Sequence, residues 1–129
     1  MVTDTSTPSM YDRIGGSPTV RAAVDRLYAW IARDDELWVN YFQGVDLPTV
    51  KGHMVKLLSQ TLGGPKQYSG RDLKQAHAHL NIKGSHYDRV VDYVLASLLV
   101  AHAPRDVMAA VEGVLLDLRP QLCTSEESA

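Results

Sequence analysis

The residue with the clearest potential for chemistry is His77, which lies in a short segment predicted to be helical, about residues 71–80. One stripe of this segment carries three apolar residues at helical spacing: Leu73, Ala76 and Leu80. His77 falls on that stripe, whereas His79 points to the opposite side of the helix. The two histidines therefore cannot hold one metal ion together from a regular helix. His77 is predicted to face the interior of the protein and His79 to face water.

Two kinds of partner suit an imidazole that points into an apolar interior, because its acceptor nitrogen must be satisfied there. A hydroxyl or a backbone N–H would make His77 an ordinary core histidine in a cofactor-free helical interaction module. A metal is the other partner, and haem iron is the metal that suits a single imidazole in an apolar slot. The sequence holds one cysteine, Cys123, which excludes an internal disulfide and a metal site made of cysteines alone.

Four long helices are predicted to surround this segment, and no stretch shows the alternation of a strand. Apolar residues recur at spacings of three and four, and these stripes cover residues 20–31, 50–62, 90–99 and 107–118. In the third stripe, Leu99 is expected to share the buried face with Val91 and Leu95. The predicted fold class is therefore all-α, with a short helical turn around residues 11–14 before the first long helix.

The ends of these helices are marked by residues that favour caps or stop helices. Ser17 and Pro18 are predicted to be the N-cap and the first-turn proline of the first long helix. The Gly-Gly-Pro sequence at residues 63–65 is predicted to stop the second one, because glycine adopts a left-handed cap and proline cannot continue a helix. Pro104 and Pro120 are predicted to begin and end the last helix.

Length and composition favour one ordinary globular domain. The 129 residues, of which 45% are hydrophobic and 22% charged, suffice for a single core. We expect a domain over residues 10–121, with polar tails at 1–9 and 122–129. The formal charge of -2 argues against nucleic acid as a partner, and no apolar run is long enough to span a membrane. The N-terminus lacks the features of a secretory signal, so a cytoplasmic location is expected.

Seven short motifs follow one another along the chain: YDRIGG at 11–16, LY at 27–28, DD at 34–35, YF at 41–42, LGGP at 62–65, YSGR at 68–71 and LKQAH at 73–77. In order and spacing this set resembles the group I truncated haemoglobins, apart from one extra residue between Asp35 and Phe42. The resemblance covers about residues 10–120. It implies a shortened globin fold, a two-over-two helical sandwich around haem b, which agrees with the helices predicted from periodicity.

The resemblance implies roles for three residues. His77 matches the proximal iron ligand, Phe42 matches the aromatic residue that packs on the haem face, and Tyr28 matches the tyrosine whose hydroxyl points at the bound ligand. Without haem, Phe42 would be a core residue, and Tyr28 would lie at the edge of a core stripe with its hydroxyl in water. The partners that the resemblance implies are the diatomic ligands O2, NO and CO.

The segment that matches the distal helix departs from the family pattern at Val50 and Met54. Relatives often carry glutamine at one or both matching positions, where the amide supports the tyrosine and the ligand. Here both side chains are apolar, and together with Leu57 they are expected to keep the pocket dry. Hydrogen bonding to dioxygen then depends mainly on Tyr28. The loss of one or two hydrogen bonds, roughly 1 to 3 kcal/mol, predicts faster oxygen release than in glutamine-bearing relatives.

His53 lies at the margin of the inward face of the same helix. In some cyanobacterial relatives a histidine at the matching position binds the iron as a sixth ligand, which would favour a redox, peroxidase-like or ligand-sensing role. The alternative for His53 is a partly exposed histidine near a haem propionate. Both interpretations stay open at the level of the sequence.

Four further residues near the predicted pocket are candidates for contact with haem: Tyr68, Arg71, Leu73 and Lys74. The polar ones among them could instead be ordinary solvated side chains. His86 and His102 have no carboxylate or histidine at a metal-ligand spacing and receive no role. Some relatives oxidise NO to nitrate using O2, and such activity here would need an unidentified reductase, because the chain has no flavin or nicotinamide domain. Whether the protein is a ligand carrier or an enzyme is open at this point.

Overall fold

The structure is a computed structural model that describes residues 8–64, 77 and 80–123. Its elements in chain order are α1 (Met10–Arg13), α2 (Gly16–Ala32), α3 (Asp35–Leu37), the π-helix η1 (Trp38–Phe42), α4 (Leu47–Thr61), α6 (Gly84–Val100) and α7 (Arg105–Leu122). No strand occurs within these described ranges. The predicted all-α class is confirmed, and the four predicted long helices correspond to α2, α4, α6 and α7.

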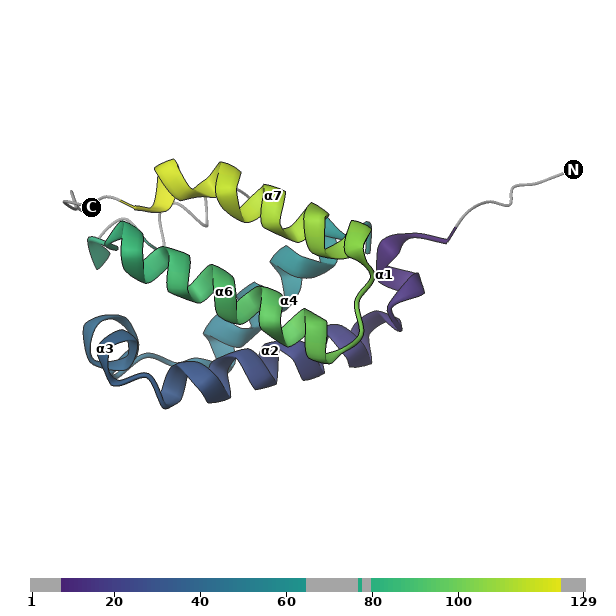
Figure 1. The fold of residues 1–129 in the computed structure, drawn as a ribbon. Helices are drawn as coiled ribbons and strands as arrows, with labels where there is room; N and C mark the ends of the chain where they lie inside the picture. The colour runs from purple at the N-terminus through teal and green to yellow at the C-terminus, as the bar shows by residue number, and fades with distance from the viewer. Residues whose placement is uncertain (1–7, 65–76, 78–79, 124–129) are drawn as a thin grey trace, which may run out of the picture.

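The four long helices form two pairs (Figure 1). α6 and α7 run antiparallel and are joined by a short turn, and α2 packs against both α4 and α6. α4 also contacts α7, so that each helix of one pair (α2 and α4) packs against a helix of the other pair (α6 and α7). This is the two-over-two arrangement that the resemblance implies, and it leaves the interior between the pairs for apolar side chains.

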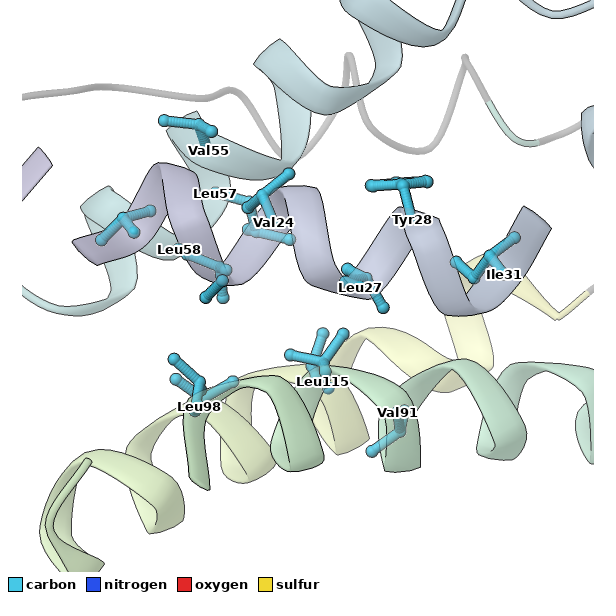
Figure 2. Packing of buried hydrophobic residues seen from close by; sticks show 14 of the residues in the cluster. Val24, Leu27, Tyr28, Ile31, Val55, Leu57, Leu58, Val91, Leu98 and Leu115 are labelled. Carbon is cyan, nitrogen blue, oxygen red and sulfur yellow. The ribbon is translucent and has the colours of Figure 1, made fainter. Parts of the chain in front are cut away.

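The core lies between the two pairs and is built from the predicted stripes. α2 contributes Val20, Val24, Leu27 and Ile31, and none of them is more than 1% exposed. The helices opposite contribute equally buried residues: Leu58, Val94, Leu98, Val107 and Val111. Figure 2 shows Leu27 of α2 and Leu98 of α6 on the sides of their helices that face one another. Each such side chain contributes about 1.5–3 kcal/mol when it leaves water, so the stripes hold the helices together.

The start of α2 differs from the prediction. The helix begins at Gly16, and its N-cap is Gly15, whose φ of 111° is in the left-handed region. Glycine reaches this conformation without strain, so the chain turns from α1 into α2 before it reaches Ser17. The predicted N-cap Ser17 was therefore wrong, and its hydroxyl instead accepts a hydrogen bond from Nε of Arg21 at 3.0 Å.

Two predictions at the other end of the chain also fail. Leu99 is 64% exposed, because eight residues at about 100° each turn it about 80° away from Val91 on the same helix. Pro120 does not end the last helix but lies inside α7, which continues to Leu122. The buried side chain of Leu122 anchors this last turn in the core, although Pro120 cannot donate a backbone hydrogen bond.

Gly64, which follows α4, packs too tightly for any larger residue. A Cβ atom there would lie 2.7 Å from Cδ1 of the buried Tyr11 and 3.0 Å from the backbone oxygen of Ser59. Replacing Gly64 with alanine is therefore expected to lower the free energy of unfolding by about 1–3 kcal/mol, the usual cost of overpacking. Chemical denaturation of the variant and the parent protein measures this difference.

Gly52, within α4, is the matched control. A Cβ atom at this position has no neighbour within 4 Å, and alanine favours a helix over glycine by about 0.8–1 kcal/mol. Gly52→Ala is therefore expected to raise stability. A Gly64→Ala protein as stable as the parent would show that Tyr11 moves aside without cost.

Candidate functional site

A cavity of about 270 Å³ lies where η1 and the four long helices converge. Its wall is mostly apolar, with contributions from Ile82, Val94 and Leu115, among others. Within the described part of the chain its polar lining residues are three tyrosines and three histidines: Tyr28, Tyr41, Tyr87, His53, His77 and His86. A pocket with an apolar wall and a few convergent polar groups is typical of a ligand site.

Seven of the residues predicted from the sequence line this cavity: Tyr28, Phe42, Val50, His53, Met54, Leu57 and His77. They come from α2, η1, α4 and the segment before α6, which are far apart in the sequence. The other four candidates lie outside the described residues: Tyr68, Arg71, Leu73 and Lys74. The fold therefore brings together every candidate residue that the structure describes.

Tyr28 and Phe42 form one aromatic corner of the cavity. Tyr28 is 5% exposed on the inner face of α2, and its ring meets that of Phe42 edge to face, with centroids 5.8 Å apart. Trp38 stacks on Phe42 with ring centroids 6.2 Å apart. The backbone N–H of Gln43 donates to the oxygen of Trp38 at 2.9 Å, a five-residue π-turn that sets the position of Phe42.

α4 supplies one wall of the cavity. Leu57 is buried, whereas Val50, His53 and Met54 are half-buried along the same face. Asp46 forms the N-cap of this helix and Pro48 lies in its first turn, as their positions in the sequence suggest. The wall offers no amide group at Val50 or Met54, so the polar side chain that it presents to the cavity is the imidazole of His53.

His77 lies in the cavity lining together with Leu80. Both side chains are half-buried. The two positions are three apart in the sequence, the spacing of the predicted stripe. His77 therefore offers an imidazole to the same apolar space that Tyr28, Phe42 and α4 enclose.

His86 and Tyr41 both line the cavity, and the sequence pattern did not indicate their polar partners. His86 is only 3% exposed. Its Nδ1 lies 2.7 Å from the hydroxyl of Tyr41, and its Nε2 lies 2.7 Å from a carboxylate oxygen of Glu36. A helical stripe does contain this residue, since Ile82, His86, Val90 and Val94 recur every four positions. That stripe was the signal that could have identified His86 as inward-facing.

Charged residues lie around Glu36, the carboxylate partner of His86. Arg89 forms ion pairs with Asp34 at 3.1 Å and with Glu36 at 3.2 Å, and the Tyr93 hydroxyl donates to Asp34 at 2.8 Å. Burial raises the pKa of Asp34, but hydrogen bonds from Tyr93, Leu37 and Arg89 outweigh it and hold that pKa below its ordinary value. The pKa of Glu36 is also lowered, chiefly by its hydrogen bond with His86. Both carboxylates are therefore ionised near neutral pH.

The donor set of the cavity suits a flat apolar group that carries a metal. Within the described ranges, no three histidine, cysteine or acidic side chains gather where they could hold a metal ion by themselves. The histidines instead lie singly in a mostly apolar lining. This arrangement suits a metal that a macrocycle already holds, because such a metal needs only one or two ligands from the protein. Among the described helices, none combines the length and the apolar character needed to cross a membrane.

Comparison with known proteins gives consistent matches. The family model of the bacterial-like globins matches residues 9–118. A group 1 truncated haemoglobin of Nostoc sp. (strain MUN 8820) is 36% identical over 107 residues, which cover 82% of this chain and 90% of the relative.

Solved structures match as well. A haemoglobin from the thermophilic phototrophic bacterium Chloroflexus aurantiacus has a TM-score of 0.76 at 29% identity, covering 94% of this chain and 100% of its own. A truncated haemoglobin of Tetrahymena pyriformis, at 23% identity, shares the fold with a TM-score of 0.78 over 89% of this chain and 97% of its own. The chain therefore belongs to the bacterial-like globin family, as a group 1 truncated haemoglobin of the two-over-two fold, and this membership implies a haem cofactor and haem-based ligand binding.

Proposed function

We propose that this protein binds O2, and also NO and CO, reversibly at the iron of haem b, and that His77 is the axial protein ligand of that iron. The observation that carries the proposal is the cavity itself, which brings His77 together with Tyr28, Phe42 and the apolar face of α4. Haem, when bound, supplies an iron atom with one coordination position for a diatomic ligand.

The residues of the cavity act on the ligand by polarity and by exclusion of water. Tyr28 carries a hydroxyl on the inner face of α2, and it is the side chain that we propose as hydrogen-bond donor to dioxygen. Val50, Met54 and Leu57 line the wall of α4 with apolar groups. Exclusion of water by this wall slows oxidation of ferrous iron, because the charge separation that oxidation needs is poorly solvated there.

Phe42 is proposed to pack on the face of the haem, since its ring lies in the lining between Tyr28 and Trp38. We also propose that four residues before His77 contact the haem: Tyr68, Arg71, Leu73 and Lys74. The polar members of this set would pair with the haem propionates, and Leu73 would pack beside the proximal imidazole.

The optical spectrum of the purified protein tests the proposed function. A red protein with a strong Soret band, which changes reversibly on addition of O2 or CO to the ferrous form, is the expected result. A colourless protein that takes up no added hemin would instead support a cofactor-free helical module. Mixing the oxygenated protein with NO, with and without a reductase, then separates a carrier from an enzyme through the yield and turnover of nitrate.

We further infer that His53 closes the second axial position of the iron when no gas is bound. The structure supports this role because His53 lines the cavity from the middle of α4. Replacing His53 with leucine is expected to shift the resting ferric spectrum from low-spin to high-spin. The apparent affinity for external ligands should rise, because the open form is then fully populated.

A matched control for this change is His102→Leu, since His102 is exposed in the turn between α6 and α7. That variant should keep the parent spectrum. A His53→Leu protein with an unchanged spin state would leave His53 with the other role, a partly exposed histidine near a propionate.

A further inference from the structure

His86 is a buried titratable group in the cavity wall that the proposed function does not use. Its side chain is 4% exposed, whereas that of its partner Glu36 is 55% exposed. One face of the imidazole therefore borders the apolar cavity, and the other is linked to a carboxylate in contact with solvent. Histidine is the side chain that most readily changes its charge near neutral pH.

The hydrogen bonds of His86 fix the position of its proton in the neutral state. Glu36 is ionised, so its oxygen can only accept, and Nε2 of His86 must carry the hydrogen that bridges the 2.7 Å gap. Nδ1 is then an acceptor, and the Tyr41 hydroxyl donates to it, also at 2.7 Å. The backbone N–H of Lys83 donates to the same hydroxyl oxygen at 3.1 Å. The site is thus complete with a neutral imidazole.

A second proton has a defined place. It would sit on Nδ1, and the Tyr41 oxygen, which has two lone pairs, can accept from Nδ1 while it still accepts from Lys83. The Tyr41 O–H must then turn away from His86. Protonation therefore requires no movement of the backbone, only reversal of one hydrogen bond.

The charged residues around His86 carry an unbalanced negative charge. Asp34 and Glu36 carry two negative charges and Arg89 one positive charge, so this cluster has a net charge of -1 until His86 becomes cationic. α6 adds Tyr87, whose hydroxyl donates to the backbone oxygen of Leu115 on α7. An imidazolium at His86 would neutralise the cluster.

Other titratable groups line the same cavity as His86. They are Tyr28 of α2, His53 of α4 and His77. The lining that α7 contributes from the described residues is apolar: Leu115, Leu118 and Leu122. Any added negative charge in this space is therefore weakly screened, and a buried base beside it gains affinity for a proton.

We propose that His86 is a redox-linked proton site: when the iron of a haem in this cavity gains one electron from a reductant, His86 takes up one proton from solvent at Nδ1. The proton returns to solvent when the electron leaves. One negative and one positive charge enter together, so the net charge of the cavity region is unchanged. This inference rests on the proposed haem binding.

The test is the reduction potential of the haem protein as a function of pH, measured with a chemical reductant and redox mediators. The His53→Leu background keeps exchange of a sixth ligand out of the result. Over the pH range in which reduction is coupled to this proton, a tenfold fall in proton concentration should lower the equilibrium constant for reduction by up to tenfold. His86→Gln should remove most of this dependence, while His102→Gln, at an exposed position, should retain it.

Glu36→Gln gives a second variant with its own expected result. Without the carboxylate, the imidazolium is less stable, so the pH dependence should persist but move to lower pH. Glu112→Gln, on the exposed side of α7, should leave the pH dependence of the reduction potential as in the parent protein. Nitrogen NMR of the ferrous CO form adds a readout that is independent of electron transfer: His86 should be the Nε2–H tautomer at high pH and doubly protonated at low pH.

The outcomes separate the two proposals. A protein that takes up no haem overturns both. A protein that binds haem and is reversibly reduced, but whose potential keeps its pH dependence in His86→Gln, overturns the proton site alone. If His86→Gln does not fold, an unshifted Glu36→Gln profile or an Nδ1–H tautomer in the parent overturns it instead.

Discussion

Replacing His77 with glycine is expected to release the haem. His77 lies in the cavity lining with a half-buried side chain, and a glycine there leaves no donor for the iron at that position and a space the size of an imidazole. The variant should lose its Soret band during purification. Added imidazole should restore both haem retention and the parent spectrum, because the free ligand occupies the space that the side chain has left.

His102→Gly is the matched control for this experiment. His102 is an exposed histidine with a φ of 64°, a conformation in which glycine is free of strain. This variant should keep its haem and its spectrum. Circular dichroism of His77→Gly should show the helices retained, so that loss of haem is not confused with loss of the fold. A His77→Gly protein with a full complement of haem and an unchanged spectrum would refute the proximal assignment.

Replacing Tyr28 with phenylalanine is expected to speed the release of dioxygen about tenfold or more. Tyr28 is the proposed donor to the ligand, and a hydrogen bond to a partly charged acceptor contributes about 1.5–3 kcal/mol, where 1.4 kcal/mol is a factor of ten in rate. Val50 and Met54 offer no amide to compensate for its loss. Stopped-flow or flash photolysis of the oxygenated protein measures the dissociation rate.

The controls for Tyr28 use the same chemical change and its converse. Tyr93→Phe removes the hydroxyl that donates to Asp34, in the cluster formed by Asp34, Glu36 and Arg89. This variant should leave the rate of oxygen release unchanged. Val50→Gln adds an amide to the α4 wall and should slow release. The dissociation of CO should change little in Tyr28→Phe, because bound CO carries less charge than bound O2. Equal rates of oxygen release in Tyr28→Phe and the parent would show that the hydroxyl does not reach the ligand.

The long helices and several residues of the cavity lining could be predicted because their signals are local. The stripe of Val20, Val24, Leu27 and Ile31 repeats with the helical period, and each of these residues is buried on α2. The same logic placed Leu57 of α4 in the cavity wall. Short motifs in a fixed order then identified the family before any packing was known.

The π-helix could not be predicted, because its cause is not a local preference. The motif spacing showed one extra residue between Asp35 and Phe42, and the structure has the five-residue turn Trp38–Phe42 in that interval. A π-turn accommodates an inserted residue without shifting the helices on either side. Asp34 caps α3, the short helix that leads into this turn, through the hydrogen bond that it accepts from the backbone N–H of Leu37 at 3.2 Å.

The partners of His86 could not be predicted because they are distant in sequence. Tyr41 and Glu36 lie 45 and 50 residues away, on elements whose approach depends on the packing of the whole chain. The spacing rules for metal and catalytic sites operate within one helix or loop. They therefore found His77 on its apolar stripe but gave no role to His86.

Resonance Raman spectroscopy of the ferrous protein is the most direct test of the proposed bond between His77 and the iron. In the His53→Leu background, which keeps the iron five-coordinate, an iron–histidine stretching band should appear and shift when the histidines carry ¹⁵N. This band should disappear on adding His77→Gly, and free imidazole should replace it with an unshifted one. A ¹⁵N-sensitive iron–histidine band that survives His77→Gly would contradict the proposed bond, because the iron would then be held by another residue.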